Sequence, residues 1–391
     1  MTTAPAASAL HDFIHAPQHL PAASAVATPY TVFSVERALA AYDELVQALP
    51  LTQVLYAVKA APFRELIAAL NLRGAGCDVA SPAEIDLCLQ AGVPAERLSY
   101  GNPIRTADEV GFAAAAGIRT WVVDTALEVQ RVALAAPGSR VIIRVANNGE
   151  GADWPLSGKF GCSPAEAVAL GRLADSYHLE VGGLSWHVGS QQRHVSGWDA
   201  PLRQAAQIWR TLAVDGIRLQ LLNLGGGLPC DAYRVPAPPL ADYAHAITAA
   251  VDRYFPDHRP QLAAEPGRSL VAAAGATVTT VKAVVDRPDG RTYVFLDGGI
   301  FSIGLVEAID SVIEYHIEAL GYSPSAPTMP VALVGPTCDS LDEIAARTPY
   351  ELPRGIGPGD RVAIWATGAY THTYSSLAFN GYRPAELVVV P

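Results

Sequence analysis

The chain has 391 residues, of which half are hydrophobic and 17% are charged, so it can bury enough apolar surface for two domains. Its 27 basic and 38 acidic residues give a net charge of −11, which argues against nucleic-acid binding. No apolar run reaches the roughly 18 residues of a membrane span, so we expect no membrane partner.

Residues 1–28 are rich in Ala and Pro and lack a cationic start followed by an apolar core. We therefore expect a loose N-terminal arm and no secretory signal. The five cysteines are scattered without a CxxC pair: Cys77, Cys88, Cys162, Cys230 and Cys338. This pattern argues against a disulfide framework or a zinc site, so we expect no metal and a cytoplasmic location.

Short apolar runs alternate with helical patterns in the first two thirds of the chain. We expect eight strands, over residues 52–58, 75–79, 98–101, 119–123, 140–145, 180–187, 217–224 and 261–264. Ser81 and Ser163 are each followed by proline and, three residues on, by glutamate, as at a capped helix start, and Thr106 begins a similar pattern. This alternation predicts an α/β fold with a (β/α)8 TIM-like barrel over residues 35–270.

After residue 270 the pattern becomes β-rich, with Gly and Pro clusters between the apolar segments. The expected strands are 276–285, 292–296, 331–334, 361–366 and 386–390. We therefore predict a C-terminal β domain over residues 271–391. The extended stretch 29–33 can add a strand to it, so residues 1–34 are expected to form an arm and a strand joining that domain.

The C-terminal ends of barrel strands form the active face of this fold, and polar or glycine residues occur at most of them. Lys59 ends an apolar strand, where a lysine is costly unless it is paired, neutral or covalently used. Partial desolvation lowers the pKa of such an amine and frees it to attack an aldehyde. The alternative is that Lys59 simply emerges into solvent, and this residue alone does not decide between them.

Three glycines follow the seventh expected strand: Gly225, Gly226 and Gly227. Loops after strands 7 and 8 commonly bind phosphate in barrel enzymes, because exposed N–H groups there approach an anion closely. Gly267, Arg268 and Ser190 offer further donors. A glycine triplet is often only a flexible turn, but its position here favours a phosphate site.

Glu265 follows the eighth strand, where a carboxylate can keep the pyridine nitrogen of pyridoxal 5′-phosphate (PLP) protonated. His187, at the end of the sixth strand, can stack on the face of that ring. The alternatives are a surface salt bridge for Glu265 and a structural role for His187.

Together these segments resemble the fold-type III PLP-dependent decarboxylases, the family of ornithine, lysine and diaminopimelate decarboxylases, whose fold is alanine-racemase-like. The resemblance covers nearly the whole chain. It is carried by motifs in family order: Tyr56–Lys59, Cys77–Ser81, His187–Ser190, Gly225–Gly227, Glu265–Arg268, Gly335–Ser340, Gly368–Tyr370 and Phe379–Gly381.

The resemblance implies that Lys59 binds the PLP aldehyde, that His187 stacks on the ring and that Glu265 pairs with its nitrogen. Asp78 and Arg144 would support the lysine and the ring. The expected phosphate ligands are Ser190, Gly227, Gly267, Arg268 and Tyr370.

The resemblance also implies that Cys338 is the acid that protonates the product carbon. In the family this cysteine and the following acid reach the site from the opposite subunit, so a homodimer is expected. The same pattern suggests that Lys159 pairs with Asp342 across the dimer interface.

Asp339 informs the expected substrate, because a carboxylate at the far end of the pocket would attract the distal ammonium of ornithine or lysine. Diaminopimelate decarboxylases usually have Glu there. Asp310 is the candidate for a second ammonium-binding carboxylate, and Tyr370 is expected to contact substrate. The expected function is decarboxylation of a basic L-amino acid to a diamine and CO2, as in polyamine biosynthesis.

Gln191 and Arg193, which follow the His187 motif, are more similar to the residues of enzymes whose substrates carry a second carboxylate. Arg234 can also bind such a carboxylate. A carboxylate-bearing diamine of the diaminopimelate, carboxynorspermidine or siderophore-precursor kind is therefore an alternative substrate. An amino-acid racemase and a non-catalytic, decarboxylase-like regulator are further alternatives. Racemases of this fold lack the Cys338–Asp339 motif, and degenerate regulators usually lose the lysine or the phosphate contacts.

Overall fold

The computed structural model describes residues 6–15, 27–49, 51 and 53–391, which form two compact units. The first unit comprises the described residues up to Ala41 together with Cys230–Pro236 and Leu270–Pro391. The second comprises Tyr42–Pro229 and Ala237–Ser269. These bounds differ from the expected domains at residues 35–41 and 230–236, which the sequence analysis placed in the barrel.

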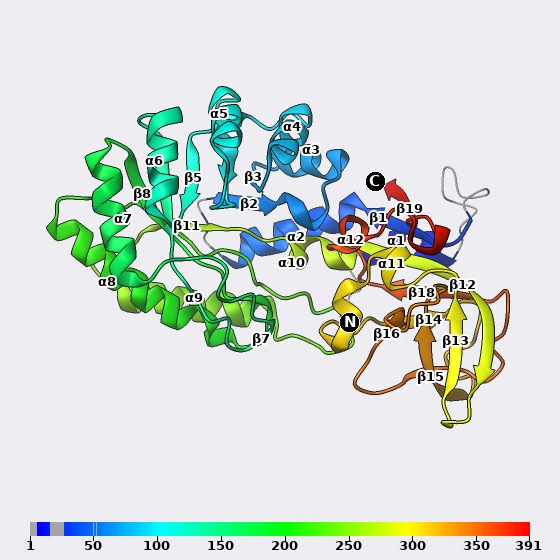
Figure 1. The fold of residues 1–391 in the computed structure, drawn as a ribbon. Coiled ribbons are helices and arrows are strands. Elements are labelled where there is room, and N and C mark those ends of the chain that lie inside the picture. Colours follow the sequence, from blue (N-terminus) through cyan, green and yellow to red (C-terminus); the bar gives the residue numbers. More distant parts are fainter. Residues whose placement is uncertain (1–5, 16–26, 50, 52) are drawn as a thin grey trace. The chain divides into compact units, whose positions relative to one another are not determined.

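The second unit is a closed barrel of eight parallel strands (Figure 1). Around the barrel they are β2 (Gln53–Ala57), β3 (Gly76–Val79), β4 (Leu98–Tyr100), β5 (Thr120–Val123), β6 (Arg140–Arg144), β8 (Glu180–Ser185), β10 (Leu221–Asn223) and β11 (Gln261–Ala264). Strand β11 closes the barrel on β2, with Ala263 opposite Gln53. Every expected barrel strand is present, so the predicted barrel is confirmed.

Helices alternate with these strands and cover the outside of the barrel (Figure 1). They are α3 (Arg64–Leu72), α4 (Pro82–Gln90), α5 (Ala107–Ala115), α6 (Ala126–Ala135), α7 (Pro164–Ser176), α8 (Asp199–Val214) and α9 (Leu240–Tyr254). Helix α2 (Val35–Ala48) precedes β2. Ser163 and Thr106 form complete capping boxes at α7 and α5, as predicted. At α4 the side chain of Ser81 caps Glu84, whose carboxylate accepts from Ala80 N–H at 2.7 Å.

The first unit contains a nine-stranded sheet. Its strands are β1 (Tyr30–Ser34), β12 (Gly275–Asp286), β13 (Thr292–Leu296), β14 (Ile317–Ala319), β15 (Thr328–Val334), β16 (Glu343–Ile344), β17 (Tyr350–Pro353), β18 (Arg361–Trp365) and β19 (Glu386–Val390). Strand β1 pairs antiparallel with β12 and parallel with β19, so the N-terminal segment joins this sheet as predicted. The five expected C-terminal strands are present, whereas the short β14, β16 and β17 were not predicted.

The expectation of a loose arm is wrong where the structure describes it, because Ala6–His15 form helix α1. Leu10 and Ile14 lie one turn apart on the same face, and both are fully buried against strands β1 and β12. The alanines around them favour a helix, so the segment can bury this face while keeping its backbone hydrogen-bonded. Residues 1–5 and 16–26 of the expected arm lie outside the described residues.

Candidate active site

Lys59 lies at the mouth of the barrel, in a short 3-10 turn (Val58–Ala60) directly after β2. Its Nζ lies 3.2 Å from Oδ2 of Asp78, which is in β3. The side chain of Asp78 is buried, whereas that of Lys59 is 51% exposed. The structure thus places a buried carboxylate beside an amine that remains open to a reactant.

Glu265 follows β11 and interacts electrostatically with both members of this pair. Burial and, to a smaller extent, the negative charge of Asp78 raise the pKa of the Glu265 carboxyl to about 7. Lys59 and Arg144 act in the opposite direction, as does a hydrogen bond from Asn223. A carboxyl with such a pKa can hold or share a proton near neutral pH.

Asn223, at the end of β10, supports Glu265 and was missed by the sequence analysis. Its Nδ2 donates to Glu265 Oε1 at 2.7 Å, and its Oδ1 accepts from the Gly225 N–H at 3.0 Å. One side chain therefore fixes both the carboxyl group and the start of the glycine turn. The only sequence signal for it is a polar residue ending an apolar strand.

His187 lies two residues beyond the end of β8, and its Nδ1 accepts a hydrogen bond from the Gly189 N–H at 3.0 Å. Burial, together with the positive charges of Arg144 and Lys59, lowers the pKa of His187 to about 3. The imidazole is therefore neutral at physiological pH. A neutral, enclosed ring is suited to stacking on an aromatic ligand.

The turn after β10 requires glycine. Gly225 and Gly227 have left-handed backbone angles, with φ of 68° and 107°. A β-carbon on Gly225 would overlap the Trp186 carbonyl oxygen, and one on Gly226 would come within 3.0 Å of His187 Nε2. The turn therefore brings bare backbone close to His187, and a side chain at any of these positions would fill that space.

Arg268, at the start of α10 (Arg268–Val271), contributes a buried positive charge to the same unit. Its Nε and Nη2 donate to Ser190 Oγ at 3.2 and 3.1 Å. Because Ser190 accepts from the guanidinium, its hydroxyl proton remains available for donation. Gly267 precedes Arg268 in the same loop. These groups are the donors that a phosphate requires.

Arg144 ends β6, and its guanidinium lies over the Phe160 ring, 5.1 Å from the ring centroid. The segment carrying Phe160 is held by Asp124, a second residue that the sequence analysis missed. Asp124 Oδ2 accepts from the Gly161 N–H at 2.8 Å, and burial raises the pKa of this carboxyl. Asp124 comes directly after β5, so its position at a strand end was the available signal.

Five expected site residues belong to the first unit: Cys338, Asp339, Asp310, Tyr370 and Arg234. Cys338 is exposed, and its N–H and Sγ both donate to Asn380 Oδ1, at 3.1 and 3.4 Å. Asp339 Oδ1 accepts from the N–H of Leu341 at 2.9 Å. Asp310 is exposed with φ of 58°, and Tyr370 has φ of 63° directly before α12 (Thr371–Tyr374).

Two arginines with expected substrate roles have local partners. Arg193 Nε donates to both carboxylate oxygens of Asp153, at 3.1 and 2.9 Å, between the paired strands β9 (Ser190–Gln192) and β7 (Ala152–Trp154). Arg234, in the first unit, donates to the carbonyls of Thr348 and Pro349 at 2.7 and 3.0 Å. Both side chains are thus used in holding their own segments.

The residues expected to pair across a dimer interface also have contacts within the chain. Asp342 is buried and accepts from the Ile300 N–H at 2.7 Å and from the Thr337 hydroxyl at 2.7 Å. Lys159 Nζ lies 4.9 Å from the centroid of the Phe160 ring. Pairing of Lys159 with Asp342 stays a prediction.

The donor set of the barrel fits PLP. Lys59 is an accessible amine for the aldehyde, Glu265 is an acid of raised pKa for the ring nitrogen, and the neutral His187 can cover a ring face. The glycine turn, Ser190 and Arg268 provide backbone space, a hydroxyl donor and a cation for the phosphate.

Comparison with known proteins agrees with this fit. Residues 34–272 match the family model described as pyridoxal-dependent decarboxylase, pyridoxal binding domain. The lysine/ornithine decarboxylase of Selenomonas ruminantium is 30% identical over 367 residues, which cover 94% of this chain and 91% of that protein. Antizyme inhibitor 2 of Xenopus laevis is 30% identical over 354 residues, covering 87% of this chain and 76% of that protein.

A solved structure of lysine/ornithine decarboxylase from Vibrio vulnificus, complexed with putrescine, is also similar. It has a TM-score of 0.84 and 25% sequence identity, with 100% of this chain and 99% of that chain covered. No helix among the residues that the structure describes is long and apolar enough to cross a membrane. From the family match and the fitting donor set, the chain belongs to the pyridoxal-dependent decarboxylases and is an amino-acid decarboxylase that uses PLP.

Proposed function

We propose that this chain decarboxylates a basic L-amino acid, ornithine or lysine, to a diamine and CO2. The observation that carries the proposal is the Lys59–Asp78 pair beside Glu265, an acid whose pKa is raised by burial. The names of the similar enzymes, which act on lysine and ornithine, support the substrate class. When bound, PLP supplies an electron-withdrawing ring that accepts the electron pair left by the departing carboxylate.

The barrel residues would orient the cofactor and control its protons. Lys59 binds the aldehyde, and Asp78 holds the Lys59 amine in place by charge. Glu265 keeps a proton at the pyridine nitrogen, and Asn223 holds this carboxyl by a hydrogen bond. His187 covers one ring face as a neutral imidazole, so it adds no charge against the protonated ring.

The loops after β8, β10 and β11 would bind the phosphate. Arg268 supplies the charge, Ser190 a hydroxyl, and the backbone of Gly227 and Gly267 supplies N–H groups, with Tyr370 as a further ligand. Gly225 and Gly226 give the turn its close approach to this region. Arg144 is the remaining cation near His187 and Glu265.

We infer that Cys338 donates a proton to the carbon that has lost its carboxylate, acting from the second copy of a homodimer. Asp339 and Asp310 would then bind the distal ammonium of the substrate through charge. We further infer a cytoplasmic location and a role in polyamine biosynthesis. The carboxylated-diamine alternative receives less support, because Asp153 already neutralises the charge of Arg193.

The test is CO2 release from ornithine, lysine, arginine and diaminopimelate by wild type and two lysine variants. Lys59→Ala should abolish release and the visible absorbance of lysine-bound PLP. Lys282→Ala is the matched control, because Lys282 is an exposed lysine that contacts Tyr382. Wild-type activity of Lys59→Ala would overturn the lysine assignment. Absence of turnover on every substrate would favour a regulator, and the relative named antizyme inhibitor 2 makes that outcome informative.

A further inference from the structure

The loop between β4 and α5, residues 101–106, packs against Asp78 through Gly101. The Gly101 N–H donates to the Val79 carbonyl at 2.9 Å, and a β-carbon on Gly101 would overlap Asp78 Oδ1. Oδ1 of Asp78 is buried without a hydrogen-bond partner, whereas Oδ2 pairs with Lys59. The placement of this carboxylate therefore depends on packing against Gly101.

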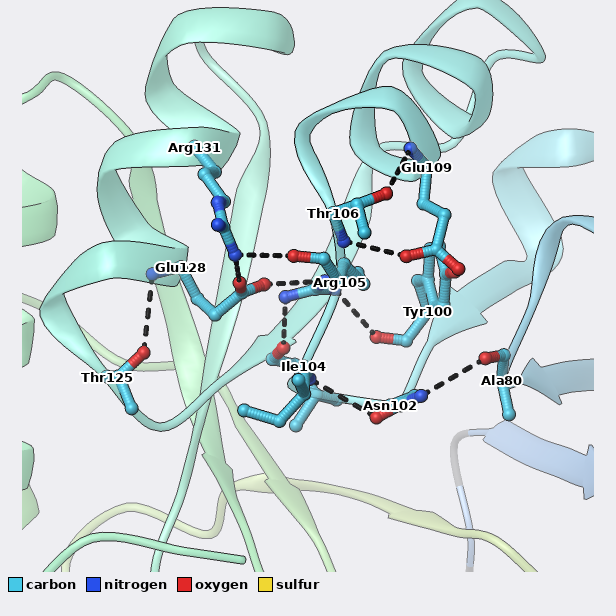
Figure 2. A network of polar contacts seen from close by, with 11 residues as sticks. Ala80, Tyr100, Asn102, Ile104, Arg105, Thr106, Glu109, Thr125, Glu128 and Arg131 are labelled. Carbon is cyan, nitrogen blue, oxygen red and sulfur yellow. Dashed lines mark hydrogen bonds and ion pairs between the residues drawn. The ribbon is translucent and has the colours of Figure 1, made fainter.

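Asn102 ties the same loop to the residues that follow Asp78 (Figure 2). Its Nδ2 donates to the Ala80 carbonyl at 3.3 Å, and its Oδ1 accepts from the Ile104 N–H at 3.2 Å. Ala80 is two residues beyond Asp78 in the chain. The Asn102 side chain thus links the β4–α5 loop to the β3–α4 loop. Neither of these two hydrogen bonds involves Lys59 or Asp78.

Arg105 anchors the other end of the loop in the interior of the unit. Its side chain has no exposed surface, and its Nε donates to Glu128 Oε2 at 2.8 Å. Nη2 donates to the Val122 carbonyl at 2.8 Å, and Nη1 donates to the Tyr100 carbonyl at 3.3 Å (Figure 2). The guanidinium also lies over the Trp121 ring, 5.4 Å from its centroid.

Arg131 completes this anchor from α6 (Figure 2). Its Nη1 donates to Glu128 Oε1 at 2.8 Å and to the carbonyl oxygen of Arg105. Glu128 therefore binds two guanidinium groups, one through each carboxylate oxygen. A buried charge that loses its partner is strongly unfavourable, so this arrangement resists displacement of the loop.

We propose that Asn102 and the Arg105–Glu128–Arg131 anchor are positioning residues for the reactive lysine. They hold Gly101 against Asp78 and so fix the carboxylate that pairs with Lys59. The proposal rests on the proposed role of Lys59. It adds that the position of the carboxylate next to this lysine is held by a network on the β4–α5 loop, strands β4 and β5 and helix α6.

The test is a pH titration of the visible absorbance of PLP bound to Lys59, recorded without substrate. Asp78 favours the protonated form of the linked nitrogen, so looser placement of Asp78 should lower the titration midpoint. Asn102→Ala removes the tie without burying a charge, and we expect a midpoint lower by about 0.5 pH unit, which is about a threefold loss of proton affinity. Gly101→Ala should shift it further, because its β-carbon displaces Asp78 directly.

Glu109→Ala is the matched control in the first turn of α5, directly after the loop. Glu109 closes the α5 capping box by accepting from the Thr106 N–H at 2.7 Å, and it makes no contact with the anchor in Figure 2. This variant should lower the melting temperature and leave the midpoint unchanged. Arg105→Lys, which keeps the charge but loses the fork of hydrogen bonds, should shift the midpoint in the same direction as Asn102→Ala.

An unchanged midpoint in Asn102→Ala and Gly101→Ala would overturn the proposal. Equal shifts in Asn102→Ala and Glu109→Ala would also overturn it, because the midpoint would then report general loosening of α5. The titration needs no turnover, so failure of the proposed substrate assignment would appear separately, as absent CO2 release from a protein with a normal titration.

Discussion

Glu265→Gln in the cofactor-free protein should change how stability depends on pH. The pKa of Glu265 is raised from 4.5 to about 7, chiefly by burial. The folded state therefore keeps a proton that the unfolded chain releases, and this acid makes stability fall as pH rises from 4.5 to about 7. At about 1.4 kcal/mol per pKa unit, the loss across this window is at most about 3 kcal/mol.

Glutamine is the appropriate replacement because it removes the ionisation and keeps the shape. Its amide oxygen can still accept the hydrogen bond that Asn223 Nδ2 donates at 2.7 Å. The variant should therefore gain stability relative to wild type as pH rises through the window. Well below pH 4.5, where this carboxyl is largely protonated in both the folded and the unfolded wild type, the two proteins should differ least.

The assay is urea unfolding of cofactor-free protein at a series of pH values between 4.5 and 7. The free energy of unfolding of wild type should fall relative to that of Glu265→Gln by up to about 3 kcal/mol over this range. Glu166→Gln is a surface control, since its capping-box hydrogen bonds lower the pKa of that carboxyl. Parallel curves for wild type and Glu265→Gln would refute the argument that burial holds the proton on Glu265.

Leu10→Ala should lower the free energy of unfolding by about 2–4 kcal/mol, measured by chemical denaturation, because it leaves a cavity beneath α1. Arg193→Met should lower the free energy of unfolding by about 1–3 kcal/mol, because the carboxylate of Asp153 loses its ion pair with Arg193. The same variant should have the wild-type ratio of kcat/KM for lysine to kcat/KM for diaminopimelate. A selective loss of activity on diaminopimelate would instead support a carboxylate-binding role for Arg193. Asn380→Ala should lower kcat severalfold with a smaller effect on KM in steady-state assays, because both the N–H and the thiol of Cys338 lose their acceptor.

The sequence predicted the barrel because its eight strands share one pattern: short apolar runs that alternate with helical segments, several of which begin at a Ser or Thr cap. Strands β14, β16 and β17 are outside this alternating pattern, and each is defined by the strand it pairs with. Helix α1 was misjudged because its Ala-rich composition outweighed the spacing of Leu10 and Ile14. These side chains are four positions apart, which is the spacing of one buried helix face.

In the site, the sequence predicted residues whose chemistry is visible at a strand end. Lys59 and Asp78 were expected to lie near each other, and the structure places Nζ 3.2 Å from Oδ2. Asn223 was missed because an amide side chain does not ionise and so does not by itself indicate a site. Its role is evident only from its hydrogen bond to Glu265. The Arg105–Glu128 pair was missed because its partners are 23 residues apart and meet only when the β4–α5 loop packs against helix α6.

A charged residue can act on a substrate only if its charge is not already matched within the fold. The Arg193 guanidinium meets both oxygens of Asp153, so a second carboxylate would have to compete with a two-point ion pair. Asp339 differs in this respect: within the residues that the structure describes, no Lys or Arg forms an ion pair with it, and its carboxylate accepts from the Leu341 N–H. Its negative charge is left for a cationic group. This difference favours a substrate with a distal ammonium over one with a distal carboxylate. Asp339 is therefore more informative than Arg193 as a residue to substitute when substrates are compared.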